Sequence, residues 1–198
     1  EGGMVDVALA EVNTTVGVDL QPLALQSVQG RISGRRLATG FTLATQGLQF
    51  KTADGVHWPG GNIKVTSTGR EGPIPAYGEL HADKLDLSVL RQIANRLPLG
   101  EATHAALKTY APAGLVEVVD ATWQGPLASP EKYQARGRVT GLALAAQPVL
   151  AGADPHAVGV PGVRGANVEF DITQAGGRAV VNITKGGALD LPGVFDEP

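Results

Sequence analysis

The segment NVEFDITQAGGRAVVNI, residues 167–183, decides the fold of this chain. Apolar Val168, Phe170 and Ile172 alternate with polar residues before the pair Gly176 and Gly177, and the alternation resumes after it. A period of two is typical of a half-buried strand, and glycines between two such runs indicate a tight turn. The segment therefore predicts an antiparallel hairpin with one apolar face.

The same alternation recurs along most of the chain, for example over residues 4–12, 41–50, 63–68 and 133–144. About ten such strands joined mostly by short turns predict an antiparallel sheet, because parallel strands need crossover helices that the sequence does not offer. The inward positions are mainly Val, Leu and Ile, and aromatic residues make up only 5% of the chain. Strands of this kind can close a sandwich or line an open trough.

One stretch, LSVLRQIANRLPLGEATHAALKTYAP at residues 87–112, has the pattern of a helix. Leu90, Ile93, Ala94 and Leu97 share one face of a helix that Asp86 can cap, and a proline follows at position 98. We expect a first β half at 1–86, a helical insert at 87–112 with its helix at about 87–111, and a second β half at 113–198. A second helical turn over about 100–110 is expected to turn its alanines and Tyr110 inward.

The composition excludes some classes of function. The formal net charge is -3, and the sixteen Lys and Arg residues form no run, so a nucleic-acid surface is not expected. Cysteine is absent, which excludes disulfides and thiolate chemistry. No run approaches the ~18 apolar residues of a membrane span.

No catalytic or metal site is expected. Ser129 and Lys132 form an S-x-x-K match, with Lys185 in a later K-G-G, but the chemistry needs this motif on a helix and the residues after Lys132 alternate like a strand. The histidines at 57, 81, 104 and 156 lie in four separate segments. No glycine-rich loop leads into a helix, so we expect no cofactor.

A series of short motifs rich in Gly and Pro carries a family resemblance. They are Gly47-Leu48, Asp54-Gly55, Trp58-Pro59, Leu97-Pro98-Leu99, Ala111-Pro112-Ala113-Gly114, Tyr133-Gln134-Ala135, Gly141-Leu142, Pro161-Gly162-Val163, Gly176-Gly177 and Leu191-Pro192-Gly193-Val194-Phe195. In order and spacing the chain resembles the YhdP-type members of the AsmA-like proteins of Gram-negative bacteria.

The resemblance implies a single β-rich segment of a larger envelope protein, anchored in the inner membrane by a part that this chain lacks. It implies a mainly β fold, with long antiparallel strands in a curled sheet that forms a hydrophobic groove. The resemblance further implies that this groove conducts phospholipid across the periplasm between the inner and outer membrane, and it implies no enzyme activity. The expected partners are phospholipid acyl chains and adjoining segments of the same longer chain, without nucleic acid.

An acyl chain needs only a dry apolar wall, worth roughly 0.8 kcal/mol per buried methylene. We expect that wall to consist of the apolar members of the alternating runs: Val5, Val7, Leu9, Val16, Val18, Leu20, Phe41, Leu43, Ile63, Val65, Val168, Phe170, Ile172, Val181 and Ile183. Leu90, Ile93 and Leu97 are expected to pack on it, as a brace or as a gate. The alternative is a closed β-sandwich that serves as a scaffold or partner-binding module of the cell envelope.

Overall fold

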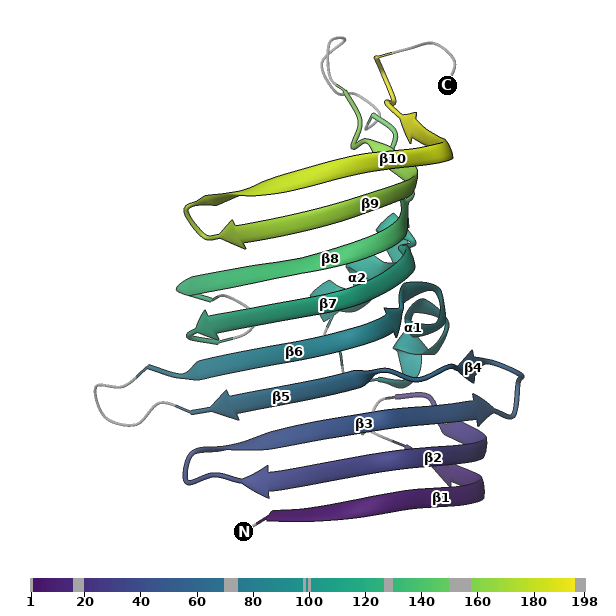
Figure 1. The fold of residues 1–198 in the computed structure, drawn as a ribbon, viewed down its shortest axis with the longest axis vertical. Helices are drawn as coiled ribbons and strands as arrows, with labels where there is room; N and C mark the ends of the chain where they lie inside the picture. Colours follow the sequence, from purple (N-terminus) through teal and green to yellow (C-terminus); the bar gives the residue numbers. More distant parts are fainter. Residues whose placement is uncertain are drawn as a thin grey trace.

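The computed structural model describes residues 2–15, 20–69, 75–97, 99, 101–126, 130–149 and 158–194 (Figure 1). Its strands are β1 (Gly2–Thr14), β2 (Leu23–Arg36), β3 (Gly40–Thr52), β4 (His57–Trp58), β5 (Asn62–Thr68), β6 (Tyr77–Asp86), β7 (Ala113–Gln124), β8 (Lys132–Leu144), β9 (Gly162–Thr173) and β10 (Gly176–Asp190). The helical elements are α1 (Leu87–Ile93), the 3₁₀ turn η1 (Ala94–Arg96) and α2 (Glu101–Tyr110).

All ten strands belong to one antiparallel sheet with the order β1-β2-β3-β5-β6-β7-β8-β9-β10, and the short β4 pairs with β3. The mainly β, antiparallel fold that the sequence predicts is confirmed. The sheet is not closed, so the alternative of a closed sandwich is wrong for the part of the chain that the structure describes. Strands of up to 15 residues, in β10, exceed the usual five or six.

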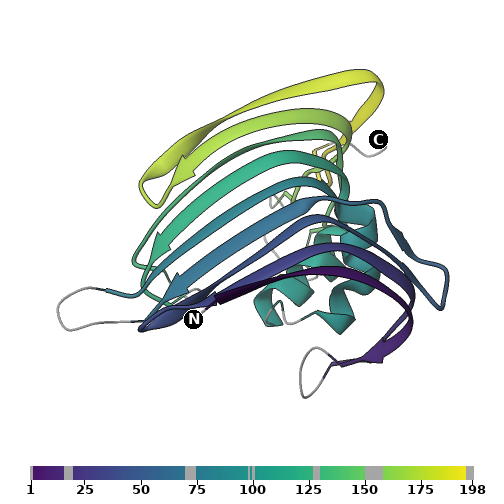
Figure 2. The same ribbon diagram turned by 60° about the horizontal axis from the view of Figure 1, so that its bottom comes forward.

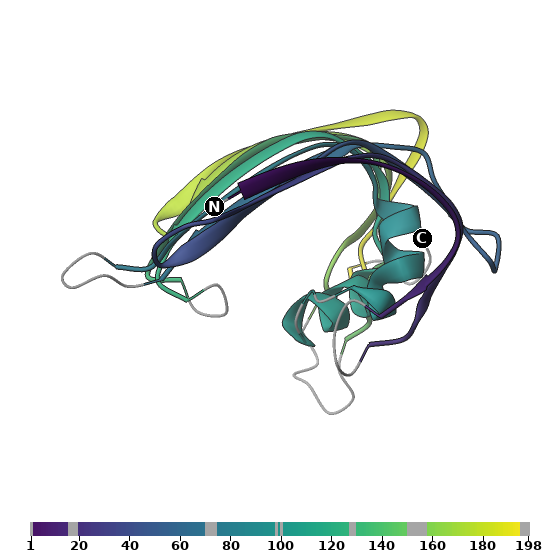
Figure 3. The same cartoon turned by 90° about the horizontal axis from the view of Figure 1, so that it is seen from below.

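The helical insert lies between two strands that are neighbours in the sheet. Asp86 at the end of β6 pairs with Leu115 near the start of β7, so the chain leaves the sheet and returns to it at the same place. The two β halves are therefore continuous with each other through the β6–β7 ladder. Figures 2 and 3 show the sheet arching over the helices, which occupy one side of its concave face.

The curl of the sheet has a local cause in the strand pairing. Register shifts occur between Gln29 and Arg31 of β2, between Val116 and Val118 of β7, and between Ile183 and Ala188 of β10. All of them lie in the strand halves next to the helical insert, whereas the halves near the β2–β3 and β9–β10 turns pair in regular register. A β-bulge bends its strand and raises its twist, so the sheet curves on the side where the bulges accumulate.

The first helix follows its sequence signals. The Asp86 carboxylate accepts hydrogen bonds from the backbone N–H groups of Ser88 (2.9 Å) and Val89 (3.1 Å), which confirms the predicted N-cap. Ile93 is only 2% exposed and packs with Trp58, Ala82, Leu85, Val116 and Val139 in the main hydrophobic core. Leu90 and Leu97 are partly buried against the same core.

The second helix differs from the expectation. Among the α2 side chains that the structure describes, Leu107 is buried, whereas Ala105, Ala106 and Tyr110 are exposed, so the inward face predicted for these three is wrong. The side chain of Ala102 lies outside the described residues. The His104 Nε2 atom lies 3.1 Å from the Leu97 carbonyl oxygen and donates to it, which turns the His104–Leu107 side toward the preceding turn.

Polar contacts tie the insert to its surroundings. The Arg96 guanidinium donates to the Asp54 carboxylate at 2.6 Å, the Gln147 side-chain amide donates to the Thr109 carbonyl at 2.7 Å, and the Ala145 N–H donates to the Tyr110 carbonyl. The hydrogen bond from Arg96 holds the pKa of the Asp54 carboxyl well below its ordinary value. Because that pKa is lowered by folding, the contribution of the pair to stability is present above the ordinary pKa of aspartate and is lost as the pH falls.

Part of the predicted wall needs a correction. Leu20 lies in a bend between β1 and β2 rather than in a strand, because β1 continues through Asn13 and Thr14 before the chain turns. Val16 and Val18 lie outside the described residues. This part of the expected wall therefore has no support from strand alternation.

The burial of Ile93 predicts that the insert stabilises the curled sheet. Replacing Ile93 with Ala leaves a cavity among Trp58, Ala82 and Val116, and we expect a loss of about 2–5 kcal/mol in the free energy of unfolding. Urea unfolding followed by circular dichroism measures it. The control is Gln92→Ala, an exposed position on the same helix, which should change stability by less than about 0.5 kcal/mol. Equal effects of the two substitutions would show that the helix does not support the sheet.

Candidate functional site

The concave face of the sheet is built from rows of side chains that run across the strands. Directly paired residues of neighbouring strands project to the same side, so the register identifies each row. The first row, which we call the rim row, lies at the strand ends farthest from the helices. It consists of Arg36, Phe41, Ser67, Gly78, Trp123 and Tyr133.

Two further rows follow toward the helices. The middle row contains no polar side chain and consists of Gly3, Gly34, Leu43, Val65, Leu80, Ala121, Ala135, Ile172 and Gly177. The inner row has Thr45 as its single polar member and consists of Val5, Ile32, Thr45, Ile63, Ala82, Val119, Gly137, Phe170 and Ala179. Each of these rows crosses nine strands.

The helices identify this side as the concave one. Ala82 of the inner row is 1% exposed and packs in the same core as Ile93, and Leu80 of the middle row contacts that core. Away from the helices the same face is open: Phe41 is 49% exposed and Val5 is 61% exposed. The concave face is thus covered along one side and uncovered along the other.

The register places the predicted wall residues that lie in strands on this one face. Phe41 belongs to the rim row, Leu43, Val65 and Ile172 to the middle row, and Val5, Ile63 and Phe170 to the inner row. The others follow at alternate positions or through cross-strand pairs on the same side: Val7, Leu9, Val168, Val181 and Ile183.

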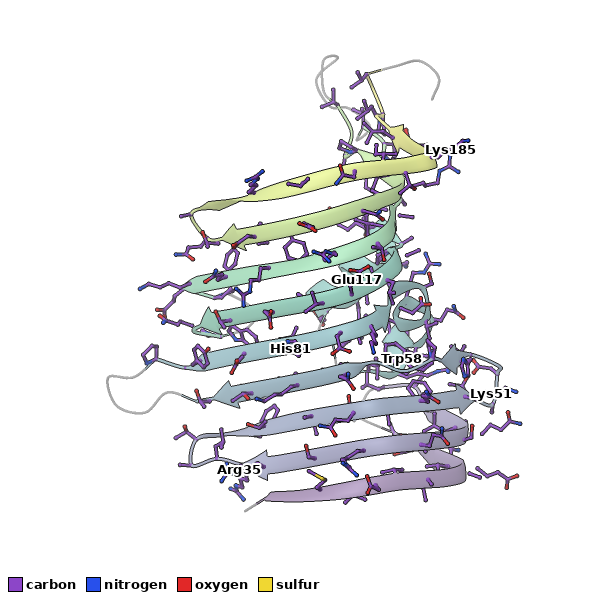
Figure 4. The ribbon with its side chains drawn as sticks, in the orientation of Figure 1. Arg35, Lys51, Trp58, His81, Glu117 and Lys185 are labelled. Atoms are coloured by element: carbon purple, nitrogen blue, oxygen red, sulfur yellow. The ribbon has the colours of Figure 1, made fainter. Side chains whose placement is uncertain are left out.

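The convex face carries charged and polar side chains at the intervening positions. One row across it consists of Met4, Ser33, Ala44, Lys64, His81, Asp120, Arg136, Asp171 and Arg178. Figure 4 views the sheet from the side opposite to α2, with His81 labelled on β6.

Ion pairs join neighbouring strands on the convex face. His81 Nδ1 lies 2.7 Å from the Asp120 carboxylate, and the Arg138 guanidinium donates to Glu169 at 2.8 Å. The hydrogen bond from His81 holds the pKa of the Asp120 carboxyl below its ordinary value, with a further contribution from Arg136. Such exposed pairs contribute little to stability. They keep the convex face charged, whereas the concave face is apolar.

Two aromatic rings lie flat on the concave face because glycine stands opposite each of them. A Cβ atom on Gly78 would overlap the indole of Trp123, and one on Gly137 would lie 2.9 Å from Cζ of Phe170. Each ring therefore covers the backbone of the neighbouring strand instead of standing away from the sheet. Although Phe170 is the bulkiest member of its run, its ring lies across Gly137 and contacts the core.

The predicted wall omits several residues of these rows. Leu80, Ala121, Trp123 and Tyr133 lie on the concave face beside the predicted ones. In β7 both faces are partly apolar, and the bulge between Val116 and Val118 shifts the alternation. The signal that finds these residues is the cross-strand register, which the alternation within one strand does not contain.

Neither the catalytic match nor the histidines form a site among the described residues. Lys132 begins strand β8 rather than a helical turn, and Ser129 lies outside the described residues. In the described part of the chain no group of three His, Asp or Glu side chains can hold a metal ion. No helix there is both long and apolar enough to cross a membrane.

An apolar concave face on one open sheet is the geometry that the sequence resemblance implies. A family model described as "YhdP protein" matches residues 1–198, the whole chain. The chain belongs to the YhdP family. Membership of the YhdP family points to a transport-related protein of the cell envelope rather than to an enzyme. No curated protein and no solved structure gives a match.

The contact between Trp123 and Gly78 predicts how the indole of Trp123 responds when a methyl group is added at position 78. In a Trp58→Phe background, Trp123 is the sole tryptophan of the chain. Gly78→Ala should push the indole off the sheet, shift its fluorescence to longer wavelength and increase acrylamide quenching, at a cost of about 1–3 kcal/mol in stability.

The matched control is Gly34→Ala in the same background. Gly34 lies on the same face, and a Cβ atom there meets nothing within 4 Å. This substitution should leave the emission of Trp123 unchanged. A similar spectral shift in both variants would contradict the flat packing of the indole on Gly78.

Proposed function

We propose that this chain forms part of a hydrophobic conduit that carries phospholipid between the inner and outer membranes. The observation that supports it is the continuous apolar surface of the middle and inner rows. At about 4.8 Å per strand, nine strands extend such a surface over roughly 40 Å along the sheet. Contacts that repeat across the strands let an acyl chain pass along the middle row from one strand to the next without crossing a polar side chain.

Burial of methylene groups supplies the binding free energy in this mechanism. Each buried methylene contributes roughly 0.8 kcal/mol, and no charged side chain of the middle or inner row fixes a lipid at one place. The rows are built from small and branched aliphatic side chains such as Ala121, Val65 and Leu43, so successive positions along the sheet have similar chemistry. A surface of this kind suits transfer along it better than tight binding at a single pocket.

The sheet edges suit a longer conduit. Strands β1 and β10 form the two edges of the sheet, and an edge strand can pair with a further strand through its backbone N–H and C=O groups. We propose that adjoining segments of the same longer chain extend the sheet there, in a periplasmic protein anchored in the inner membrane elsewhere.

The helical insert fits a brace better than a gate. Ile93 and Ala94 are buried in the core, and contacts to Asp54, Ala145 and Gln147 hold the insert at separate points. A gate has to move away from the sheet at a small cost in free energy. That motion would remove Ile93 from the hydrophobic core. On this account Leu90, Ile93 and Leu97 keep the curvature of the sheet fixed while lipid passes beside them.

Site-specific photo-crosslinking in cells tests the proposed function. A photoreactive side chain at Phe41 or Ile172, both exposed on the concave face, should label phospholipid. Phe170 is a poorer position, because its ring lies across Gly137. The neighbouring residues Thr42 and Asp171 project from the convex face and serve as matched controls. Equal labelling from both faces, or labelling from the convex face alone, would contradict the proposed function.

A further inference from the structure

The rim row differs from the two rows beside it in carrying polar and amphipathic side chains. It contains Arg36, Ser67, Trp123 and Tyr133, whereas the adjacent middle row has no polar side chain. Arg36 is exposed, and within the described residues no carboxylate forms an ion pair with it. One uncovered side of the concave face is therefore bordered by an exposed arginine and two aromatic hydrogen-bond donors.

Tryptophan and tyrosine with this placement suit the boundary between an apolar and an aqueous phase. Their rings are apolar and their N–H or O–H groups are polar, which is why they gather at the interfaces of membranes. No hydrogen bond links the Trp123 Nε1 or Tyr133 hydroxyl to another described residue. Both donors are thus available to a phosphate or ester group at the rim.

The width of the open side matches one acyl chain. From Trp123 in the rim row to Val119 in the inner row is four residues along β7, about 14 Å at ~3.4 Å per residue. The hydrocarbon of one membrane leaflet is about 15 Å thick, half of the ~30 Å core of a bilayer. A chain that lies parallel to the strands therefore reaches from the rim to the helices.

The opposite orientation is blocked by the helical insert. Beyond the inner row, Leu85, Val116 and Val139 are buried beneath Ile93 of α1, so a headgroup has no free surface on that side of β6, β7 and β8. The apolar side chains Leu87 and Leu90 of α1 border this covered region instead. These two side chains give the methyl ends of acyl chains an apolar surface to contact.

From these observations we infer that the rim row is the headgroup side of the conduit, with Arg36 as the contact for the lipid phosphate. Acyl chains lie along the strands from the rim toward α1, and the headgroup moves along the rim in water. This inference rests on the proposed function, because it specifies how the phospholipid of that proposal is oriented.

Two photoreactive forms of phosphatidylglycerol test the orientation. One carries a diazirine on the headgroup and the other carries it at the end of an acyl chain. The purified protein is irradiated with vesicles of each, and mass spectrometry locates the crosslinks. The headgroup probe should label Phe41, Trp123 and Tyr133, and the chain-end probe should label Val119, Phe170 or Leu90.

The outcomes separate the two proposals. If the chain-end probe labels the concave rows but the headgroup probe labels α1 or the convex face, the orientation is wrong and the conduit stands. If both probes label the same residues without segregation, the orientation is again wrong. If neither probe labels the concave face, the conduit itself fails, and the orientation with it.

Arg36 is tested with a lipid that lacks the phosphate. Arg36→Gln should reduce labelling by the chain-end phosphatidylglycerol probe about fivefold, the scale of one exposed charge contact. Labelling by a diacylglycerol with the same diazirine should stay unchanged, and Arg36→Lys should restore the phospholipid signal. Arg35→Gln, on the convex face of the same strand, is the matched control. Equal losses for both lipids, or no loss for either, would exclude the phosphate contact.

Discussion

The register of the antiparallel sheet is the constraint on which the rest of the structure depends. Side chains alternate strictly along a strand, so a shift by one residue in any ladder would move the apolar positions of that strand to the convex face. The pairs Leu43–Val65, Leu80–Ala121 and Ala135–Ile172 hold the middle row together over strands that are far apart in sequence. The separation of an apolar from a charged face follows from this register and not from any single strand.

The curvature of the sheet and the position of the helical insert depend on each other. Bulges bend the strands near the insert, and the hollow they produce is filled by Ile93 and its neighbours. Without the insert, Trp58, Leu85 and Val116 would face water, at roughly 25 cal/mol for each Å² of apolar surface. The uncovered side keeps regular register and remains accessible. One side of the concave face therefore supplies stability, and the other supplies the surface available to a ligand.

Strand alternation and helix capping could be predicted from the sequence, since both depend on residues close together in the chain. The hairpin at 167–183, the cap at Asp86 and the burial of Ile93 belong to this group. The inward face of α2 could not be predicted, because the position of the preceding turn selects Leu107 over the alanines. The alternation of Leu20 with Val16 and Val18 predicts a strand, but alternation alone does not reveal where β1 ends.

The residues of the rim and middle rows were found only in part, for a related reason. Trp123 and Tyr133 lie in the same row as Arg36 and Phe41. That row is defined by the pairing between strands, which the sequence of a single strand does not reveal. The flat packing of Trp123 likewise requires Gly78. These two residues are paired in space, but the whole helical insert lies between them in the sequence. Local periodicity contains no information on such cross-strand neighbours, whereas it does contain the apolar face of each strand.

The central claim is that the apolar concave face, and not the protein surface in general, holds phospholipid. Lipid mass spectrometry of the purified protein tests it with two adjacent substitutions on β3: Leu43→Asp places a charge in the middle row, and Ala44→Asp places one on the convex face opposite Lys64. The account predicts that phospholipid co-purifies with the unaltered protein and with Ala44→Asp, and that Leu43→Asp loses it while remaining folded. Equal amounts of phospholipid in both variants, or none in the unaltered protein, would contradict it.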